Sequence, residues 1–311
     1  MIPTIDIVIV NWNTGKQLFE CLQSLGTCER DKILIHEIIV VDNLSSDDSP
    51  DNIPGIEIPI RVVRNSSNLG FARACNIGAE ISSADYLLFL NPDTKVFPES
   101  IQTPMLFMNE PENHKIGVVG IQIIDELNKI SKTCARIPSG TDFIYTSLGL
   151  HKILPNLFPD YVLHSWDHNS NRLVEHVMGS YYLIRRHLFQ ELNGFDEQFF
   201  VYLEDLDLSA RVLQKGYSIY YLSTVQIFHK GGGASENVKA QRLSYVLRSK
   251  LTFYKNHLSL GFRAINFFVT LTIEPFARIF GAVLRRSFSE IPETVTAYML
   301  LYKTLLFSKR T

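Results

Sequence analysis

The sequence predicts an α/β fold with a mostly parallel central sheet, flanked by helices and followed by a helical C-terminal extension. Through the first hundred residues, short apolar runs alternate with helical patterns. Runs such as IIVV and YLLFL are apolar at every position, which is typical of strands buried on both faces. The chain has 311 residues, 46% of them hydrophobic and 20% charged, so it can bury a core of this kind.

The first five elements follow a strand–helix–strand–helix–strand order. Their expected ranges are 5–10, 17–25, 37–41, 70–81 and 86–90. Between 94 and 175 prolines interrupt the pattern, and only 116–124 is typical of a strand. From Val174 onward we expect a strand interrupted by Gly179, a short helix that ends at Gly194, a helix that ends at Gly216 and then a strand.

The last segment differs in composition, and we expect a helical extension at 236–311 after an α/β domain at 1–235. From His257 onward the tail carries a net charge of +4, which leaves the remainder at −6. A helical projection gathers apolar side chains on one side and arginines on the other. The apolar set is Phe262, Ile265, Val269, Ile273, Phe276 and Phe280, and the arginines are Arg263, Arg278 and Arg285.

This amphipathic helix is expected to bend at Pro275. Its longest uncharged run, 264–273, is far shorter than the roughly 20 residues of a membrane span, so we expect it not to cross a bilayer. Three partners stay open for 260–311: the anionic face of a membrane as a peripheral contact, the chain's own domain, or a second copy in a homodimer.

Charge and cysteine content argue against a nucleic-acid-binding protein, a zinc-finger protein and a disulfide-bonded secreted protein. Thirty Lys and Arg against 32 Asp and Glu give a net charge of −2, too balanced for a nucleic-acid partner. The four cysteines show neither CxxC pairs nor zinc-finger spacing, which indicates reduced thiols. The N-terminus lacks the basic region and cleavage site of a secretory signal, so the predicted location is cytoplasmic.

Polar residues follow three of the expected strands: Asn11 after the first, Asp42 after the next, and NPD at 91–93 after YLLFL. In parallel sheets, ligands bind beyond the carboxyl ends of the strands. No GxGxxG follows the first strand and no GxxxxGK[ST] occurs, so neither a dinucleotide fold nor a P-loop is indicated. Carboxylate and amide oxygens instead suit a base, a ribose and a hard divalent cation.

Seven segments in order carry a resemblance to a known family. They are VIVNWNTGKQLFECLQSL, IIVVDNLSSDDS, NSSNLGFARACNIGA, YLLFLNPDT, VMGSYYLIRR, GFDEQFFVYLEDLDLSAR and IFHKGGGAS. Together they resemble the GT-A-fold family 2 glycosyltransferases, most closely the rhamnosyltransferase-like branch that builds bacterial surface polysaccharides. The resemblance covers about residues 5–255 and implies a nucleotide-sugar-binding half at 1–95 and an acceptor-side half at 96–235.

The resemblance implies roles for donor-binding residues. Asp42 would accept from the imide N–H of uracil or thymine, with Asn11 in the same pocket; an Asx turn is the structural alternative for Asp42. Gly70 would let the backbone approach the phosphates at a helix amino end, and Arg73 would contact the nucleotide. A simple turn at Gly70 and a solvated Arg73 are the alternatives.

The segment LNPDT stands where the family has its DxD motif. Asn91 replaces the first acid, so one negative charge is lost, although the amide oxygen can still accept from a ribose hydroxyl. Asp93 keeps the metal-binding position, with a turn or helix cap as the alternative. His229, before the glycine run 231–233, would contact the metal or the diphosphate, with Lys230 as a diphosphate-facing alternative.

The acidic segment YLEDLDL matches the family's ED motif, whose second acid acts as the base. That assigns catalysis to Asp205 and acceptor placement to Glu204, while dipole complementarity at a helix start is the alternative. Gly179 would line the acceptor wall or simply kink a strand. Arg211 would pair with these acids.

The implied reaction is an inverting transfer of a sugar, with L-rhamnose suggested by the branch, from a dTDP- or UDP-sugar to a hydroxyl of a growing or lipid-linked glycan. It would use a divalent metal, Mn²⁺ or Mg²⁺. The alternative is a non-catalytic partner of a polysaccharide assembly system that binds nucleotide sugar or membrane, which the Asn91 departure keeps open.

Overall fold

The computed structural model describes residues 2–231 and 238–307, which form two compact units. The first unit takes the described parts of Met1–Arg136, Val162–Glu197 and Glu204–Ala234. The second takes those of Ile137–Tyr161, Gln198–Leu203 and Ser235–Thr311. Two earlier segments thus group with the C-terminal helices, and the domain limit at 235 stays a prediction.

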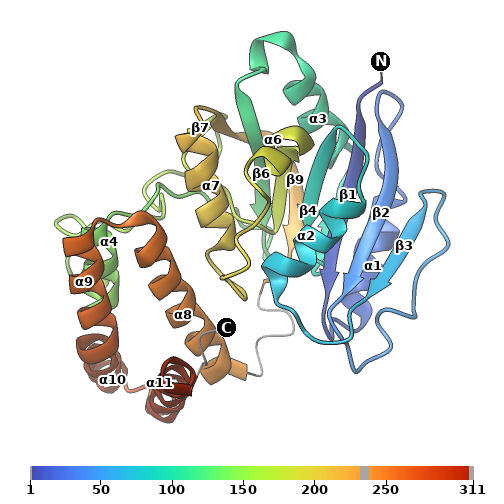
Figure 1. Cartoon of the computed structure of the whole chain (residues 1–311). Coiled ribbons are helices and arrows are strands. Elements are labelled where there is room, and N and C mark those ends of the chain that lie inside the picture. Colours follow the sequence, from blue (N-terminus) through green and yellow to red (C-terminus); the bar gives the residue numbers. More distant parts are fainter. Residues whose placement is uncertain (1, 232–237, 308–311) are drawn as a thin grey trace. The chain divides into compact units, whose positions relative to one another are not determined.

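Four strands form the parallel half of the sheet in the first unit (Figure 1). Their order is β3 (Ile60–Arg64), β2 (Leu34–Asp42), β1 (Thr4–Asn11) and β4 (Tyr86–Leu90). β1 pairs with both β2 and β4, and Asn11 is the register partner of Asp42. This confirms the predicted early strands, while β3 was not expected.

Beyond β4 the sheet becomes mixed. β8 (Tyr181–Arg185) runs antiparallel to β4 and to β6 (Ile116–Ile124), and β6 pairs in parallel with β9 (Ser218–His229). The short β5 (Thr94–Val96) and β7 (Arg172–Val174) both pair antiparallel with β9. The stretch around Gly179 is therefore a turn between β7 and β8, which pair with different strands, rather than an interruption of one strand.

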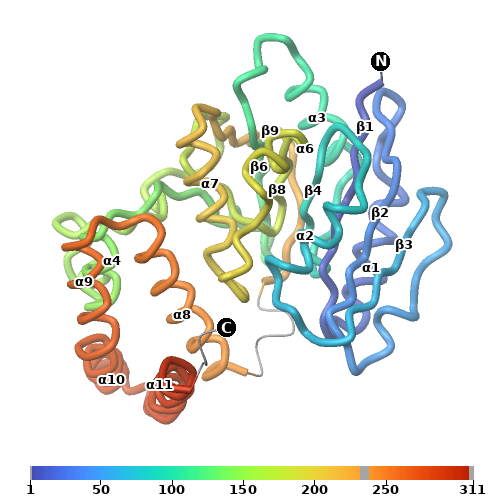
Figure 2. Tube along the Cα trace, in the orientation of Figure 1, coloured from blue at the N-terminus to red at the C-terminus, as the bar shows by residue number. Residues whose placement is uncertain are grey.

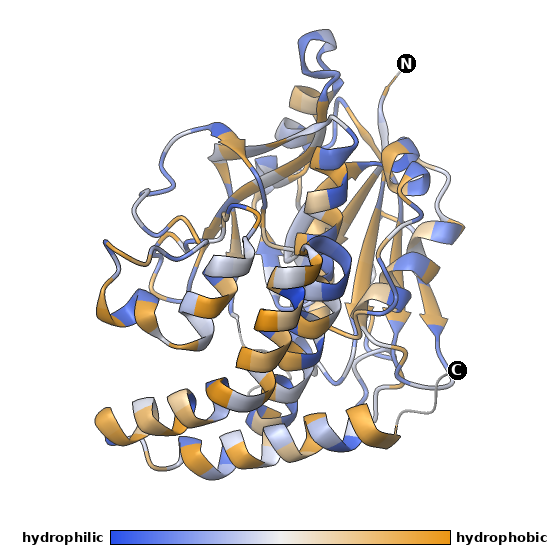
Figure 3. Ribbon diagram, turned by 60° about the vertical axis from the view of Figure 1, so that its left-hand side comes forward, coloured by the Kyte–Doolittle hydropathy of each residue, from blue (hydrophilic) through white to orange (hydrophobic). Residues whose placement is uncertain are grey.

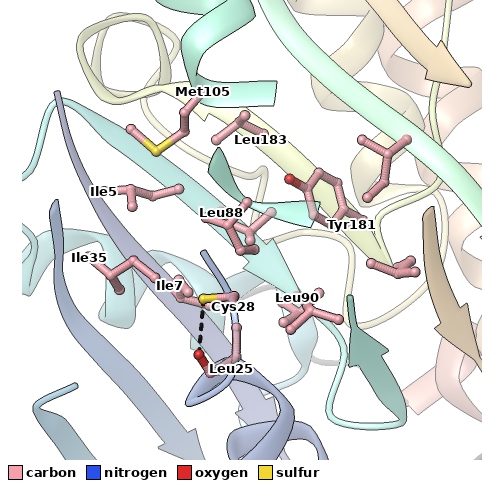
Figure 4. Packing of buried hydrophobic residues seen from close by; sticks show 14 of the residues in the cluster. Ile5, Ile7, Leu25, Cys28, Ile35, Leu88, Leu90, Met105, Tyr181 and Leu183 are labelled. Carbon is pink, nitrogen blue, oxygen red and sulfur yellow. Dashed lines mark hydrogen bonds between the residues drawn. The ribbon is translucent and has the colours of Figure 1, made fainter. Parts of the chain in front are cut away.

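The two faces of the sheet carry separate apolar clusters, because successive side chains of a strand point to opposite sides. In β1, Ile5, Ile7 and Ile9 belong to one cluster, and Val8 and Val10 belong to the other. Figure 4 shows part of the first cluster, in which the Cys28 thiol donates to the Leu25 carbonyl at 3.0 Å. Burial on both faces explains why these strands lack polar alternation.

Helices complete the first unit (Figure 2). Their bounds are α1 Lys16–Leu25, α2 Phe71–Ile81, α3 Gln102–Asn109, α6 Arg186–Glu191 and α7 Glu204–Gln214. Leu18, Cys21, Leu22 and Leu25 of α1 pack into the first cluster, and Ala72, Ala74, Cys75 and Ala79 of α2 pack into the second. The four cysteines are free and buried, and burial raises the pKa of the Cys21 thiol to about 12.

The second unit is helical. It contains α4 (Gly140–Ser147), α5 (Leu150–Ile153), α8 (Lys239–His257), α9 (Leu260–Phe268), α10 (Glu274–Leu284) and α11 (Glu290–Phe307). A π-helical turn, Val269–Ile273, joins α9 to α10. It ends just before Pro275, whose ring clashes with a regular α-helical turn and where the sequence predicts a bend.

The segment 260–284, whose uncharged run was expected to be too short to cross a bilayer, is one helix of 25 residues. By length and composition alone it suffices, and only 22% of its most apolar window is buried. A helix in a protein core normally buries its apolar face, but this helix buries polar side chains. Asn266, Thr270 and Glu274 are buried, whereas Phe276 and Phe280 are 73% and 64% exposed. Figure 3 shows hydrophobic residues recurring along the helices of this unit.

Buried polar groups hold this helix to its unit. Lys250 of α8 donates to Glu274 at 2.6 Å and to Ser147 of α4 at 2.7 Å. Arg278 donates from Nε and Nη2 to the other oxygen of Glu274, at 2.9 and 2.7 Å. Burial by itself would raise the pKa of Glu274, but the neighbouring Lys250 and Arg278 outweigh it and lower that pKa.

Candidate active site

Three predicted donor-binding residues lie at one edge of the parallel half-sheet. Asn11 and Asp42 are the last residues of β1 and β2, and Asn91 follows β4 directly. Parallel strands present their carboxyl ends at the same edge, where open α/β sheets bind ligands. The topology therefore gathers these residues from three separate segments.

Asp42 is buried and held by short polar contacts. Ser45 Oγ and Asn11 Nδ2 donate to Asp42 Oδ1 at 2.6 and 2.8 Å, and the Ser45 amide donates to Oδ2 at 3.2 Å. Asn11 Nδ2 also donates to Ser49 Oγ at 2.9 Å, and its Oδ1 accepts from Thr14. The Asn11 amide is therefore engaged within the protein, whereas Asp42 Oδ2 keeps acceptor capacity for a base N–H.

Asn43, a residue without a predicted role, ties the loop before α2 to this edge. Its Nδ2 donates to the Gly70 carbonyl at 2.9 Å, and its Oδ1 accepts from the Leu69 amide and from Asn65 Nδ2. Gly70 has a φ of 86°, a conformation that favours glycine, and precedes the first residue of α2. Asn43 directly follows Asp42 in the sequence VVDN, and this position at a strand end is the signal that could have identified it.

Arg73 lies in the first turn of α2, one turn from this loop. Its side chain is 55% exposed, and its Nε lies 3.8 Å from Glu197 Oε2. Its contact with the nucleotide stays a prediction.

Asp93 and His229 lie side by side although 136 positions separate them in the chain. Thr94 of β5 is the register partner of His229 in β9, and the Lys230 amide donates to the Asp93 carbonyl at 3.2 Å. This pairing brings His229 Nε2 to 3.2 Å from Asp93 Oδ1, with both side chains largely buried. Residues 232 and 233 of the predicted glycine run lie outside the described residues.

The Asp93–His229 pair fits a divalent cation held jointly with a ligand. Among the described residues no group of three or more His, Cys, Asp or Glu could hold a metal ion. Two neighbouring ligands at about 2.1 Å from an octahedral ion are about 3 Å apart, close to the 3.2 Å separation found. Mg²⁺ and similar ions commonly take only one or two protein ligands and complete their shell with water and phosphate oxygens.

Glu204 and Asp205, adjacent at the start of α7, have different environments. Burial, and then the charge of Asp205, raise the pKa of Glu204 well above its usual range. Glu204 therefore holds a proton more readily than an exposed glutamate does, and its Oε2 finds no hydrogen-bond partner within the described part of the chain. A buried protonated acid can donate a hydrogen bond, which a carboxylate cannot.

Asp205 is held from two sides. The Gly179 amide donates to its Oδ2 at 2.7 Å, and the Leu206 amide donates to its Oδ1 at 2.8 Å. A Cβ at Gly179 would lie 3.0 Å from Oδ2, so the missing side chain is what allows this approach. The structure thus gives Gly179 a contact with the predicted base, and its place in an acceptor wall stays a prediction.

The third acid of this segment is structural. Arg211, one turn further along α7, donates from Nε to Asp207 Oδ2 at 2.8 Å. Its Nη1 donates to the carbonyls of Leu192 and Gly194, both at 2.9 Å. The pair fastens α7 to the turn after α6, as the predicted ion-pair role of Arg211 requires.

A short backbone path connects the Asp205 and Asp93 regions. Asp205 contacts the Gly179 amide, and the carbonyl of the next residue, Ser180, accepts from the Asn91 amide at 3.1 Å. Asn91 lies two residues before Asp93. The predicted base and the predicted metal ligand therefore lie at the same end of β4, within one unit.

His176 was also missed from the sequence. It is buried three residues before Gly179, and its Nε2 lies 3.9 Å from Asp205 Oδ2. Its other ring nitrogen contacts Ser209 at 3.0 Å. Because these partners lie about 30 positions further along the chain, only the fold shows the contact.

The sequence matches family models over most of its length. A model described as glycosyl transferase family 2 matches residues 6–192, and one described as glycosyl transferase family group 2 matches residues 158–308. The chain is 25% identical over 283 residues to the N-acetylglucosaminyl-diphospho-decaprenol L-rhamnosyltransferase of Mycobacterium tuberculosis, with 85% of this chain and 88% of that protein covered.

Two further similarities extend over part or all of the chain. Over 147 residues it is 29% identical to rhamnosyltransferase WbbL of Escherichia coli, which covers 47% of this chain and 52% of that protein. The solved mannosyltransferase PcManGT from Pyrobaculum calidifontis, in complex with GDP-Man and Mn²⁺, matches with a TM-score of 0.58 at 13% identity. That match covers 100% of this chain and 89% of the solved one and supports the GT-A-like fold.

The family models identify the chain as a glycosyltransferase, and its sheet is GT-A-like. The chain belongs to glycosyl transferase family 2, as the seven segments predicted.

Proposed function

We propose that this protein is an inverting glycosyltransferase that moves a sugar from a nucleoside-diphosphate sugar to a hydroxyl of a growing or lipid-linked glycan. The observation that carries the proposal is the arrangement at the α7 start, where Asp205 accepts the Gly179 amide beside the buried Glu204, at the same strand end as Asp93. Acids in distinct protonation environments are the usual means of dividing donor and base roles.

The reaction forms a bond between the acceptor oxygen and the anomeric carbon as the carbon–oxygen bond to the diphosphate breaks. Asp205 takes the proton of the acceptor hydroxyl, and the bonding electron pair leaves with the nucleoside diphosphate. Glu204, in the protonated form that its burial favours, donates a hydrogen bond that orients the acceptor. Since attack comes from the side opposite the leaving group, the anomeric configuration inverts and no covalent enzyme intermediate is needed.

The donor is held by groups at the strand ends. Asp42 Oδ2 accepts the imide N–H of uracil or thymine, and the side-chain oxygen Oδ1 of Asn91 accepts from a ribose hydroxyl. Asp93 and His229 hold a divalent metal, Mn²⁺ or Mg²⁺, which stabilises the charge of the leaving diphosphate when bound. Support comes from the 3.2 Å separation of these two side chains and from the Mn²⁺ named for the similar mannosyltransferase.

The names of the two relatives make L-rhamnose, from a dTDP- or UDP-linked donor, the sugar to test first. The Mycobacterium tuberculosis relative is named for an acceptor carried on diphospho-decaprenol, and we propose a lipid-linked acceptor here too. The protein would then work in the cytoplasm, at the inner face of the membrane.

Peripheral membrane contact through 260–311 suits such an acceptor. The helices α9, α10 and α11 expose many large apolar side chains. They include Phe262, Ile265, Phe268, Phe276, Phe280, Val283, Leu284, Met299 and Leu305. Arg286 is exposed in the turn after α10, and Glu274, the acid of this helix, is buried and neutralised. Apolar side chains with flanking arginines are typical of helices that lie in an anionic membrane surface.

A donor panel tests the function. UDP-, dTDP- and GDP-sugars with Mn²⁺ or Mg²⁺ are scored by thermal shift and by release of nucleoside diphosphate. We expect stabilisation by a uracil or thymine donor and an Asp205→Asn loss of turnover of about 10²- to 10⁴-fold, with donor binding unchanged. Glu191→Gln, a surface carboxylate paired with Lys215, is the control.

Two results would contradict parts of the proposal. Stabilisation by GDP-sugars alone would remove the role of Asp42 in base recognition. Donor binding without Asp205-dependent release, for every acceptor offered, would favour the non-catalytic binding partner instead.

A further inference from the structure

We propose that His176 is a positioning residue for Asp205: its neutral Nε2–H form, fixed by Ser209 and Tyr182, orients the carboxylate so that Oδ1 faces the acceptor. The inference rests on the proposed function, because it assigns a second contact to the proposed base. It adds a group that none of the predicted motifs contains.

A backbone hydrogen bond holds His176 in place independently of its ring. Its carbonyl accepts from the Ala135 amide at 3.1 Å in an antiparallel bridge just after β7. The chain then reaches Gly179, whose amide donates to Asp205 Oδ2. The segment 176–179 therefore lies against Asp205 with two groups, one imidazole and one backbone amide.

Three side chains continue the contact into the core. Asp205 and Ser209 are one helical turn apart and so lie on the same face of α7. His176 Nδ1 lies 3.0 Å from Ser209 Oγ, which lies 3.1 Å from the Tyr182 hydroxyl. Ser209 and Tyr182 are fully buried. Because these two side chains do not contact solvent, their hydrogen-bonding groups must find partners within the protein.

One assignment of donors and acceptors fits the contacts among His176, Ser209 and Tyr182 best. A negatively charged carboxylate near Nε2 favours the proton on that nitrogen, which leaves Nδ1 as an acceptor. Ser209 then donates to Nδ1 and accepts from the Tyr182 hydroxyl, so each group uses its proton once. Burial lowers the pKa of His176, while Asp205 opposes that shift, so the ring is neutral at neutral pH.

The consequence for Asp205 is an asymmetry between its two oxygens. Oδ2 faces the Gly179 amide at 2.7 Å and the His176 ring at 3.9 Å, whereas within residues 2–231 and 238–307 Oδ1 accepts only the adjacent Leu206 amide. The separation of 3.9 Å exceeds a hydrogen bond, and contacts at catalytic groups commonly shorten when substrate binds. Oδ1 is thus the oxygen left to take the acceptor proton.

A matched pair of variants tests this role. A Gln amide nitrogen occupies about the place of His Nε2, and an Asn amide nitrogen that of Nδ1. We expect His176→Asn to lower kcat about tenfold, with the KM for the best donor of the panel unchanged, and His176→Gln to retain most of kcat. Equal losses in the two variants, or unchanged kcat in His176→Asn, would overturn the proposal.

A second measurement needs no substrate. The ¹⁵N chemical shifts of the histidine rings distinguish the two neutral tautomers, and the His176 signals are those missing in His176→Asn. We expect the Nε2–H form in the wild-type protein, and Nδ1–H would overturn the proposed direction. Because this readout does not depend on turnover, it separates failure of this inference from failure of the proposed reaction.

Discussion

Glu204, Asp205 and Asp207 lie within one turn of α7 and yet have three different environments. Asp207 is paired with Arg211, Asp205 accepts two backbone amides, and Glu204 is buried beside a like charge. A helix amino end favours negative charge, but burial opposes it, and at Glu204 burial outweighs the dipole. The charge of each acid therefore depends on its surroundings rather than on the residue type.

The raised pKa of Glu204 predicts a pH-dependent stability. Between the unfolded pKa of about 4.3 and the raised folded pKa, the native state binds more protons, so stability falls as pH rises, by about 1.4 kcal/mol per unit at most. Glu204→Gln removes this dependence. We expect the variant's gain in free energy of unfolding to grow from about pH 5 to 8, measured by urea denaturation. Parallel curves for variant and wild type would contradict it.

The close approach at Gly179 predicts a selective loss of activity. In Gly179→Ala the new Cβ meets Asp205 Oδ2 at 3.0 Å and its Cβ at 3.2 Å, so the carboxylate must shift. Because small displacements of reacting groups are costly, we expect turnover to fall about tenfold or more while stability changes by about 1 kcal/mol. Gly55→Ala, where the added Cβ meets nothing within 4 Å, is the control. Equal turnover of the two variants would refute the argument.

The sequence motifs indicated candidate site residues but not the contacts between them. Asp93 and His229 could each be proposed from a motif, yet their contact depends on the pairing of β5 with β9. His176 carries no motif at all, because its partner Ser209 is 33 positions away. Contacts between distant segments arise from sheet topology, which apolar periodicity does not encode.

At the scale of elements, continuously apolar strands were predictable, and short or half-exposed ones were not. β1, β4 and β6 are buried along nearly their whole length and are therefore mostly apolar, because helices or other segments cover both faces. β3 is partly exposed at the sheet edge, and β5 has three residues, so neither gives a periodic signal. For the helix 260–284, periodicity predicted two faces but not which one is buried.

The helix 260–284 buries its polar face around Glu274, and this burial depends on Lys250, which lies on α8. Glu274→Gln would leave the Lys250 charge buried without its counter-ion. We expect a loss of about 3–5 kcal/mol in free energy of unfolding, because an uncompensated buried charge is costly. The double variant Glu274→Gln/Lys250→Met should recover part of it, as a double-mutant cycle would show.

The loss in free energy of unfolding caused by Glu274→Gln should become smaller at alkaline pH. Burial lowers the pKa of Lys250. A lysine with a lowered folded pKa releases its proton earlier in the native state, so stability rises with pH between the folded and the unfolded pKa values. Glu274→Gln removes the group that opposes this shift and widens that pH interval. A deficit that stays constant with pH would show that Lys250 is not its cause.

At the scale of the whole molecule, many large apolar side chains of α9, α10 and α11 stay exposed to solvent. Burying a Phe side chain is worth roughly 1.5–3 kcal/mol, so a helix that keeps several exposed forgoes this stabilisation. Contiguous exposed apolar surface is typical of interaction sites. Peripheral membrane contact would use this surface without disturbing the polar face held by Lys250.

We therefore expect Phe276→Ser/Phe280→Ser to weaken binding to anionic phosphatidylglycerol vesicles at least about tenfold in co-sedimentation, since two inserted aromatic rings are lost. Both side chains are more than 60% exposed, so the fold should be unchanged by circular dichroism. Leu127→Ser, which replaces a side chain 71% exposed in the first unit, should bind like the wild type. Replacing phosphatidylglycerol by neutral phosphatidylcholine should also weaken wild-type binding, because the arginines lose their counter-charges. Unchanged vesicle binding with a shift from dimer to monomer would instead assign this face to a second copy of the chain.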